Sequence, residues 1–322
     1  MVFVFLYDQK LKSGANKKIK SFLHYVVENN LNIRFVLHKS ALSLNSDLNY
    51  KLIHSNSRVL KLLVFLRNFQ SDVIVSDFVG STLLNRKIYW LIHDIRPIHG
   101  LKGSLNAIFY KFLIHWTKNF VVVSEFTKEE VLKINPRANV ILWQNGVVIK
   151  DYQKNFTGYE YDVIMVGAFV ARKSHLEALD WLNEFADRNN RILKVCLVGT
   201  SGPIVNEIDD KNYPKLEIEL NIDITDDALK EKWNLSRCTL SNSKYEGFNY
   251  TVLESLSIGR NVVLTDIGGH KHFKDIQGCF YYSDKLTFDK ALKNGLSDSK
   301  IEHFELSKFD ERYNTKLFLN SL

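Results

Sequence analysis

The sequence predicts an α/β protein of two domains, each built on a parallel sheet with helices on both faces. Short continuous apolar runs, typical of buried parallel strands, alternate with longer segments that carry an apolar stripe at helical spacing. This alternation stops at a polar, aperiodic stretch, residues 150–160, and then starts again. The chain has 322 residues, which is enough for two domains that each bury a core.

In the first half, the apolar runs are the expected strands and the amphipathic segments are the expected helices. The segment 17–30 illustrates the helical pattern, because its apolar side chains fall on one face of a helix. The expected strands are, in order, 2–7, 33–37, 73–75, 88–92, 120–123 and 140–142. The expected helices are 17–30, 59–69, 105–118 and 127–133. Strands that alternate with helices imply a doubly wound parallel sheet.

The same pattern returns in the second half, after the turn signal at Asn145 and Gly146. The expected strands are 162–166, 193–198, 216–220, 239–240, 262–264 and 279–282, the last of them at the sheet edge. The expected helices are 174–189, 226–235, 249–258 and 301–322. We therefore expect two facing Rossmann-like domains with parallel sheets, and an active site in the cleft between the domains.

Composition and cysteine usage exclude several protein classes. The chain is 45% hydrophobic and 25% charged, which is ordinary for a soluble globular protein. Its three scattered cysteines favour a reducing compartment over a disulfide framework or a zinc site. The apolar run at the N-terminus ends at Asp8, too early for a signal peptide, and no apolar run reaches the length of a membrane span. We expect a cytoplasmic protein.

Charge is divided unevenly between the two halves. Residues 1–150 hold 21 Lys and Arg against 9 Asp and Glu, a net charge of +12, whereas residues 151–322 carry a net charge of −5. Such a split indicates an anionic partner for the first half. A membrane surface, an acidic acceptor and nucleic acid are the candidates, and basic faces that are merely solvated are the alternative.

Aromatic and cationic side chains occur together in the expected helix 105–118. The residues concerned are Phe109, Tyr110, Phe112, Trp116, Lys111, His115 and Lys118. Aromatic residues beside cations favour a membrane interface, although an aromatic stripe at helical spacing is also typical of a core helix. The helix 17–30 and the loop before it are a rival membrane contact. One expectation is therefore peripheral contact of the basic domain with an anionic membrane, on the inner face of the cytoplasmic membrane.

The stretch 242–270 carries the strongest functional signal. A glycine loop leads into the expected helix 249–258, which ends at Gly259 because glycine takes the left-handed position past a helix end at little cost. The amides and the positive end of the dipole at such a helix start suit a phosphate. Two carboxylates, Glu246 and Glu254, lie on either side of the helix start.

Two other segments place polar residues at the carboxyl ends of expected strands. The loop 167–173 contains Arg172 and Lys173, and two cations there can neutralise a diphosphate whose charge grows as it leaves. His93 and Asp94 follow the strand 88–92, at the sheet edge where open α/β sheets bind their ligands. No Gly-x-Gly-x-x-Gly or P-loop motif occurs, so a dehydrogenase or a P-loop ATPase lacks support.

The segment around Glu246, Gly247, Phe248 and Glu254 resembles the Glu-x7-Glu region of retaining glycosyltransferases of family 4, which have the GT-B fold. The loop 167–173 resembles the family's Gly-Arg…Lys-Gly loop, which holds the donor pyrophosphate. There Lys173 matches the family lysine, and Ala168 and Ser174 stand where the family has Arg and Gly. The strand that ends in His93 and Asp94 is similar to the family's strand ending in His-Asp.

This resemblance implies a function for each domain. Residues 1–150 would bind the acceptor, residues 151–300 would bind a UDP- or GDP-sugar, and the helix in 301–322 would pack back on the N-terminal domain. The enzyme would transfer the sugar to a hydroxyl of a glycan or lipid-linked acceptor with retention of configuration, in bacterial surface polysaccharide, lipopolysaccharide or glycoconjugate synthesis. The nucleotide sugar is the co-substrate, and neither a cofactor nor a metal ion nor nucleic acid is expected.

The resemblance also implies roles for individual residues. Candidate catalytic residues are Glu246, His93 and Lys173. Candidate donor-binding residues are Gly167, Arg172, Lys173, Gly247, Phe248, Asn249, Tyr250, Thr251 and Glu254. In this scheme Glu254 binds the ribose, Glu246 positions the donor sugar, and the two cations bind the diphosphate. Candidates on the acceptor side are Gly14 and Asp94.

Two other functions stay open at this point. A GT-B sugar-nucleotide epimerase would share the fold and the donor site, and its product would distinguish it from a transferase. A basic nucleic-acid-binding module without transferase activity would account for the charge of the first half, although no nucleic-acid-binding motif is recognised.

Overall fold

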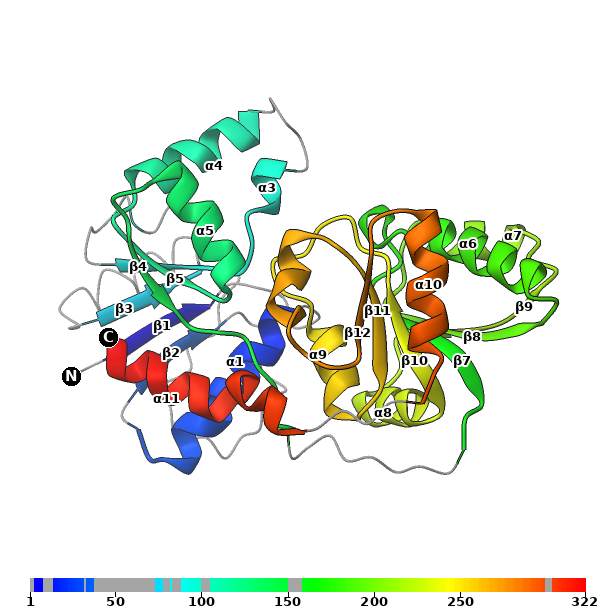
Figure 1. Cartoon of the computed structure of the whole chain (residues 1–322). Helices are drawn as coiled ribbons and strands as arrows, with labels where there is room; N and C mark the ends of the chain where they lie inside the picture. Colours follow the sequence, from blue (N-terminus) through cyan, green and yellow to red (C-terminus); the bar gives the residue numbers. More distant parts are fainter. Residues whose placement is uncertain are drawn as a thin grey trace. The chain divides into compact units, whose positions relative to one another are not determined.

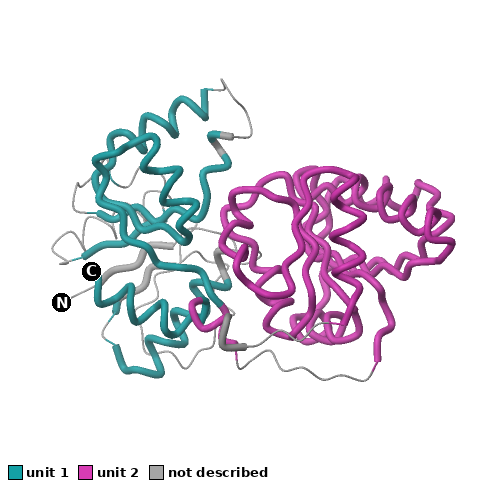
Figure 2. The backbone as a smooth tube through the Cα atoms, viewed as in Figure 1, with its two compact units in different colours: residues 1–146, 309–322 teal, residues 147–308 magenta. Residues whose placement is uncertain are grey.

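The structure is a computed structural model, and its chain divides into two compact units. It describes residues 3–7, 14–31, 33–37, 73–77, 82, 88–99, 105–149, 158–298 and 303–322 (Figure 1). Unit 1 consists of residues 1–146 and 309–322, and unit 2 of residues 147–308 (Figure 2). The helix expected at 59–69 lies outside the described residues, as does most of the polar stretch 150–160.

Unit 1 is built on a parallel sheet of six strands. They are β1 (Phe3–Tyr7), β2 (Ile33–Leu37), β3 (Val73–Ser76), β4 (Ile88–Ile92), β5 (Asn119–Val122) and β6 (Asn139–Leu142). Their order across the sheet is β2-β1-β3-β4-β5-β6, with every pair parallel. The continuous apolar runs of the sequence are therefore strands that helices cover on both sides.

Helices cover both faces of this sheet (Figure 1). On one face, α1 (Gly14–Glu28) and α11 (Glu311–Ser321) enclose a core around Phe22, Trp143 and Phe318. On the other face, α4 (Leu105–Trp116) and α5 (Glu125–Ile134) pack over β4 and β5. The short α3 (Arg96–His99) packs against α4.

Residues 309–322, at the end of the chain, belong to unit 1. Residues 303–322 form a 3-10 turn, His303–Phe309, and then α11, rather than one continuous helix, because Asp310 caps the new helix by accepting a hydrogen bond from the Tyr313 amide. The ring of Phe318 stacks on Trp143, with the ring centroids 4.4 Å apart. A side chain at Gly146 would overlap the Phe309 carbonyl, so glycine is required where the two segments cross.

Unit 2 is a second parallel sheet of six strands. They are β7 (Tyr161–Val166), β8 (Leu193–Gly199), β9 (Leu216–Ile222), β10 (Ser236–Ser241), β11 (Asn261–Thr265) and β12 (Cys279–Tyr282). Their order is β12-β11-β10-β7-β8-β9, again parallel throughout. The order reverses between β7 and β10, which is the Rossmann arrangement.

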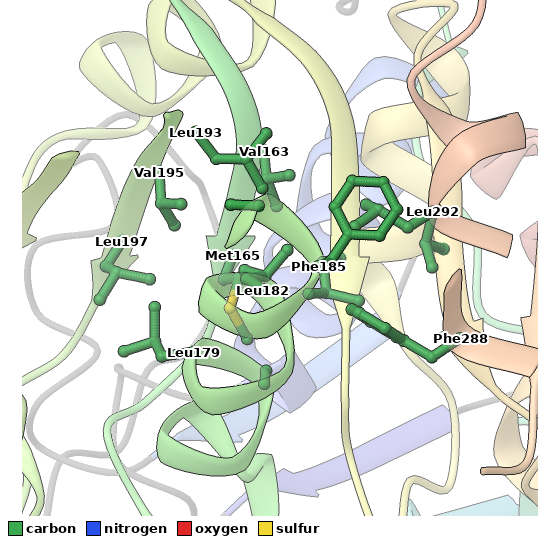
Figure 3. Packing of buried hydrophobic residues seen from close by; sticks show 14 of the residues in the cluster. Val163, Met165, Leu179, Leu182, Phe185, Leu193, Val195, Leu197, Phe288 and Leu292 are labelled. Atoms are coloured by element: carbon green, nitrogen blue, oxygen red, sulfur yellow. The ribbon is translucent and has the colours of Figure 1, made fainter. Parts of the chain in front are cut away.

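The larger core of unit 2 lies between this sheet and the helices α6 (His175–Arg188), α7 (Val205–Asp210) and α10 (Lys285–Gly295). Figure 3 shows side chains from the sheet, such as Val163 and Leu197, packed against Leu182 and Phe185 of α6 and Leu292 of α10. The second core lies around Trp233 of α8 (Asp226–Asn234), together with Ile258 at the end of α9 (Tyr250–Ser257). The predicted fold of two parallel α/β units is confirmed.

Candidate functional site

The candidate site lies where the strand order of unit 2 reverses. At the carboxyl end of β7 the chain continues into a loop from Gly167 and a 3-10 turn, Ala171–Lys173. At the carboxyl end of the neighbouring strand β10, the loop 242–249 leads into α9. Because both strands are parallel, the two loops meet at the same edge of the sheet, at the topological switch point where open α/β sheets bind ligands.

Three hydrogen-bond donors converge on one carboxylate oxygen at this edge. Lys173 Nζ lies 2.6 Å from Glu246 Oε1, and Arg172 Nη1 lies 2.9 Å from the same atom. The Ser243 hydroxyl donates to it as well, at 2.8 Å. Glu246 is buried, Lys173 is largely covered, and Arg172 is about one-third exposed. The structure therefore brings together the two predicted diphosphate-binding cations and the predicted sugar-positioning carboxylate.

The electrostatics of this cluster favour an anionic ligand. Burial opposes ionisation of Glu246, but the charges of Lys173 and Arg172 outweigh it and lower the Glu246 pKa to about 2. Glu246 is therefore a carboxylate at neutral pH, and the two cations together exceed it by one positive charge. Lys173 folds over the end of β7, because Gly167 has no side chain and a Cβ there would lie 3.0 Å from Lys173 Cε.

Ser174 joins the cation loop to α6 in a strained conformation. Its backbone is left-handed, with φ 50° and ψ 42°, a region that favours glycine. Its carbonyl accepts a hydrogen bond from Asn242 Nδ2 at 3.0 Å, and the Tyr282 hydroxyl donates to Asn242 Oδ1 at 2.7 Å. These buried bonds connect the loop after β7 to the loop after β10 and fix the backbone that carries Arg172 and Lys173.

The start of α9 is organised by Asn249 and His270. Asn249 Nδ2 donates to Ser241 Oγ at 2.8 Å and to His270 Nε2 at 3.0 Å, while His270 Nδ1 donates to the Thr265 carbonyl at 2.7 Å. Burial lowers the His270 pKa to about 4, so the ring is neutral. Within the described part of the chain, the Asn249 side chain makes no capping bond, although it stands at the N-cap of α9. Its hydrogen bonds to Ser241 and His270 fix the start of the helix instead.

The other predicted donor residues lie on or beside the same helix. Phe248 is buried against Phe273, with the two ring centroids 5.5 Å apart. The ring centroids of Phe248 and Tyr250 lie 5.4 Å apart. Thr251 Oγ1 donates to the Val166 carbonyl at 3.4 Å, at the end of β7. Glu254 is buried farther along α9. Together with Gly247 between Glu246 and Phe248, these residues complete the predicted donor set within unit 2.

The remaining predicted residues belong to unit 1. His93 directly follows β4, and burial lowers its pKa to about 4, so its imidazole is neutral. Asp94 accepts hydrogen bonds from the Arg96 amide, at 3.0 Å, and from Arg96 Nε, at 2.7 Å. Gly14 is the first residue of α1.

Sequence reasoning did not include four residues of the site. Ser243 donates to Glu246, His270 positions Asn249, and Asn242 connects the two loops. A side chain at Gly269 would overlap the Glu246 carbonyl, so glycine lets the segment after β11 approach the carboxylate loop. The Gly268-Gly269 pair was the signal of a close backbone approach.

The described residues hold neither a cluster of metal-binding side chains nor a helix that could cross a membrane. In those residues, no group of three or more His, Cys, Asp and Glu side chains is placed to hold a metal ion. Among the helices that the structure describes, none combines the length and apolarity that a membrane span requires.

Part of the chain is similar to a family of known proteins. Residues 160–298, which include the cluster, match the family model described as "Glycosyl transferases group 1". The search of curated protein sequences gives no match.

Solved structures match the whole chain. HepE from Anabaena, in a complex with UDP and glucose, is 13% identical with a TM-score of 0.75, and the match covers 100% of both chains. The lipopolysaccharide outer core galactosyltransferase WaaB is 16% identical with a TM-score of 0.70, covering 100% of this chain and 99% of the other. WaaG, a glycosyltransferase involved in lipopolysaccharide biosynthesis, is 12% identical with a TM-score of 0.65, covering 100% and 96%. At these identities the likeness establishes the fold, and the predicted GT-B fold is confirmed.

Proposed function

We propose that this protein is a glycosyltransferase that moves a sugar from a nucleotide diphosphate sugar to an acceptor hydroxyl. The observation that carries this proposal is the convergence of Lys173 and Arg172 on Glu246 at the switch point of unit 2. Cations at this point suit a diphosphate, and a buried carboxylate beside them suits the hydroxyls of a sugar. The match of residues 160–298 to glycosyl transferases group 1 supports the same activity.

The donor is proposed to bind along α9 and the loop after β7. Arg172, Lys173 and the amides of residues 249–251 contact the diphosphate, because a helix start and two cations both favour negative charge. Glu254 accepts hydrogen bonds from the ribose. The donor is a UDP- or GDP-sugar, and UDP is the first nucleotide to test, since the similar HepE structure holds UDP and glucose.

Transfer proceeds with retention of configuration at the anomeric carbon. The bond between that carbon and the diphosphate oxygen breaks, and a bond to the acceptor oxygen forms on the same face. The acceptor proton passes to the leaving diphosphate. Lys173 and Arg172 stabilise the charge that grows on the diphosphate, and Glu246 holds the donor sugar and stabilises the positive charge on its ring. His93 hydrogen-bonds the transferred sugar through its neutral imidazole.

The proposed acceptor is a glycan or a lipid-linked glycan of surface polysaccharide synthesis. The similar structures of WaaB and WaaG, which are named as lipopolysaccharide enzymes, support this acceptor class. As the family resemblance implies, the reaction runs without a metal ion, so EDTA should leave the rate unchanged.

Product analysis tests the proposal. The protein is incubated with UDP- and GDP-sugars and with lipopolysaccharide core acceptors, and the released nucleotide diphosphate and the product are followed. We expect UDP or GDP to be released together with a new glycosidic bond, whose anomeric configuration by NMR equals that of the donor. An inverted product would overturn the retaining mechanism. A changed sugar without transfer would identify an epimerase, and no reaction with any pair would contradict the transferase proposal.

A further inference from the structure

Helix α4 of unit 1 exposes a continuous apolar face. The large apolar side chains on this face, with their exposed fractions, are Leu105 (87%), Ile108 (57%), Phe109 (52%), Phe112 (54%) and Trp116 (56%). At 3.6 residues per turn these five positions fall within an arc of roughly 100°. The rings of Phe112 and Trp116 stack, with centroids 6.1 Å apart. We call these five residues the α4 apolar face.

The α4 apolar face is not the side of the helix that packs into the core of unit 1. Ala107 and Ile114 on the opposite side of α4 are buried, as is Leu113 between that side and the apolar face, and Leu113 and Ile114 belong to the core with Trp90 and Phe120. That side already attaches the helix to the sheet. Exposed apolar patches of this kind are unusual on soluble proteins and mark surfaces that bind a partner or a membrane.

The charges around the α4 apolar face are positive. The helix contains no acidic residue; its Lys111 and His115 are exposed, and so is Lys118, two residues after its end. At the same helical spacing, Lys111 and His115 fall on the arc that borders the apolar face on one side, and Lys118 follows shortly after the end of the helix. Within the described part of the chain, neither Lys111 nor Lys118 forms an ion pair, and on the neighbouring α3 the charge of Arg96 is balanced by Asp94.

We propose that the α4 apolar face docks on the surface of an anionic lipid bilayer. Phe109, Phe112 and Trp116 enter the boundary between headgroups and acyl chains, where amphipathic aromatic rings are favoured, and Lys111 and Lys118 contact the phosphates. Charge complementarity favours this partner, because α4 carries no acidic residue, the exposed Lys111 and Lys118 lie on and just after the helix, and this half of the sequence carries a net charge of +12. The helix lies on the bilayer rather than crossing it, since it is only 12 residues long.

Vesicle co-sedimentation of the whole protein tests this docking. Vesicles of pure phosphatidylcholine are compared with vesicles containing about 30% phosphatidylglycerol, at low and high salt. The protein should bind the anionic vesicles, bind the neutral ones at least tenfold more weakly, and dissociate as salt rises. Equal binding to both vesicle types, or no binding to either, overturns the proposal.

Three variants separate the contributions. Phe109→Ser combined with Phe112→Ser and Trp116→Ser should abolish binding. Lys111→Gln and Lys118→Gln should each weaken it about fivefold, which corresponds to about 1 kcal/mol. The matched control combines Ile192→Ser with Leu286→Ser, which are exposed apolar residues of unit 2, and should bind like the unchanged protein. Thermal unfolding checks each fold. Unchanged binding by the triple variant overturns the proposal.

Tryptophan fluorescence gives an independent readout. The chain has five tryptophans, and Trp116 is exposed, whereas Trp90, Trp143 and Trp233 are buried. Vesicles with brominated acyl chains should quench part of the tryptophan emission of the unchanged protein. The Trp116→Phe variant lacks the residue that emits this part, so its emission should not be quenched. If the triple variant instead abolishes self-association, measured by analytical ultracentrifugation, and no quenching occurs, then a second copy covers this face and the lipid proposal is wrong.

Discussion

Lys173 Nζ lies 2.6 Å from Glu246 Oε1, so the cation loop after β7 and the carboxylate loop after β10 are joined by a largely covered ion pair. Such a pair positions the lysine before any ligand arrives. Arg172 and Ser243 contact the same carboxylate oxygen. In the proposed reaction, the cations that bind the diphosphate and the carboxylate that binds the donor sugar therefore lie side by side.

Replacing Lys173 by methionine should slow transfer more than it weakens donor binding. The lysine is the cation proposed to stabilise charge that grows on the diphosphate as the sugar leaves, so we expect kcat to fall about 100-fold and donor KM to change less. Steady-state kinetics measure both. Lys244→Met is the matched control, because Lys244 is an exposed lysine of the neighbouring loop and lies 3.8 Å from Glu177. Equal kcat in Lys173→Met and the control would contradict this role.

Replacing Glu254 by glutamine should raise the donor KM. Glu254 is buried in α9, and its proposed partners are the ribose hydroxyls, which would lose a charged acceptor. A hydrogen bond to a charged group contributes about 1.5–3 kcal/mol to the free energy of binding. The donor KM should therefore rise at least tenfold, while kcat falls less. Glu231→Gln, at an exposed position of α8, should leave both constants unchanged. A donor KM that stays constant in Glu254→Gln would remove the ribose role.

Replacing Ser174 by glycine should stabilise the protein. Ser174 holds a left-handed backbone conformation that costs a residue with a side chain about 1–2 kcal/mol. Loss of its 3.3 Å hydrogen bond to the Ala171 carbonyl offsets part of the gain, so we expect about 1 kcal/mol in denaturant unfolding. Asn190→Gly, also left-handed at φ 46°, should gain less, because asparagine tolerates this conformation better. A destabilised Ser174→Gly would mean that the serine hydroxyl matters more than the strain.

Acidification should destabilise the protein partly through His175. Burial, aided by the charge of Lys173, lowers its pKa from 6.5 to about 4. Between these values the folded state binds fewer protons than the unfolded state, so stability rises with pH and is lost as the pH falls. From pH 7 to pH 5 this group should cost about 2 kcal/mol.

A difference measurement isolates this effect. His175→Gln should lose about 2 kcal/mol less than the unchanged protein between pH 7 and pH 5, in denaturant unfolding at each pH. His115→Gln, at an exposed histidine of α4, should follow the unchanged protein. Parallel pH profiles for His175→Gln and the unchanged protein would show that His175 is not held neutral.

Removing the carboxylate of Glu311 should destabilise unit 1. Glu311 of α11 pairs with Lys18 of α1 at 3.0 Å, both side chains are buried, and Lys18 also donates to the Gln144 carbonyl at 2.6 Å. Glu311→Ala leaves a buried charge without its partner, which costs about 3–5 kcal/mol. Glu28→Ala breaks the exposed pair with Arg312 between the same two helices and should cost at most about 1 kcal/mol. Equal losses in thermal unfolding would contradict the account.

The strands could be predicted because burial on both faces makes them continuous apolar runs. β2, β4 and β12 have the predicted bounds. β10 is six residues long rather than two, because Ser236, Arg237 and Ser241 interrupt the apolar pattern, although the two serines are buried. The helix α10 was missed, although Asp284 and Thr287 form a capping box at its start, because few of its residues are apolar and buried, Phe288, Ala291 and Leu292 among them.

The site could be predicted only in part, for a topological reason. Lys173 and Glu246 are far apart along the chain, and they meet because β10 lies beside β7 in the sheet. Alternation of strands and helices does not specify that order. The buried polar residues Ser243 and His270 have no sequence signal of their own, because their roles depend on which loop faces them.

Calorimetric titration of nucleotide sugars into the whole protein tests the central claim most directly. We predict that one UDP- or GDP-sugar binds at a single site and, at 100 times its Kd, raises the free energy of unfolding by about 2.7 kcal/mol. The combined variant Arg172→Ala and Lys173→Ala, shown by its own unfolding curve to be folded, should bind at least 100-fold more weakly. Equal affinity in this variant, or no binding of any nucleotide sugar to the unchanged protein, would contradict the assignment of the site.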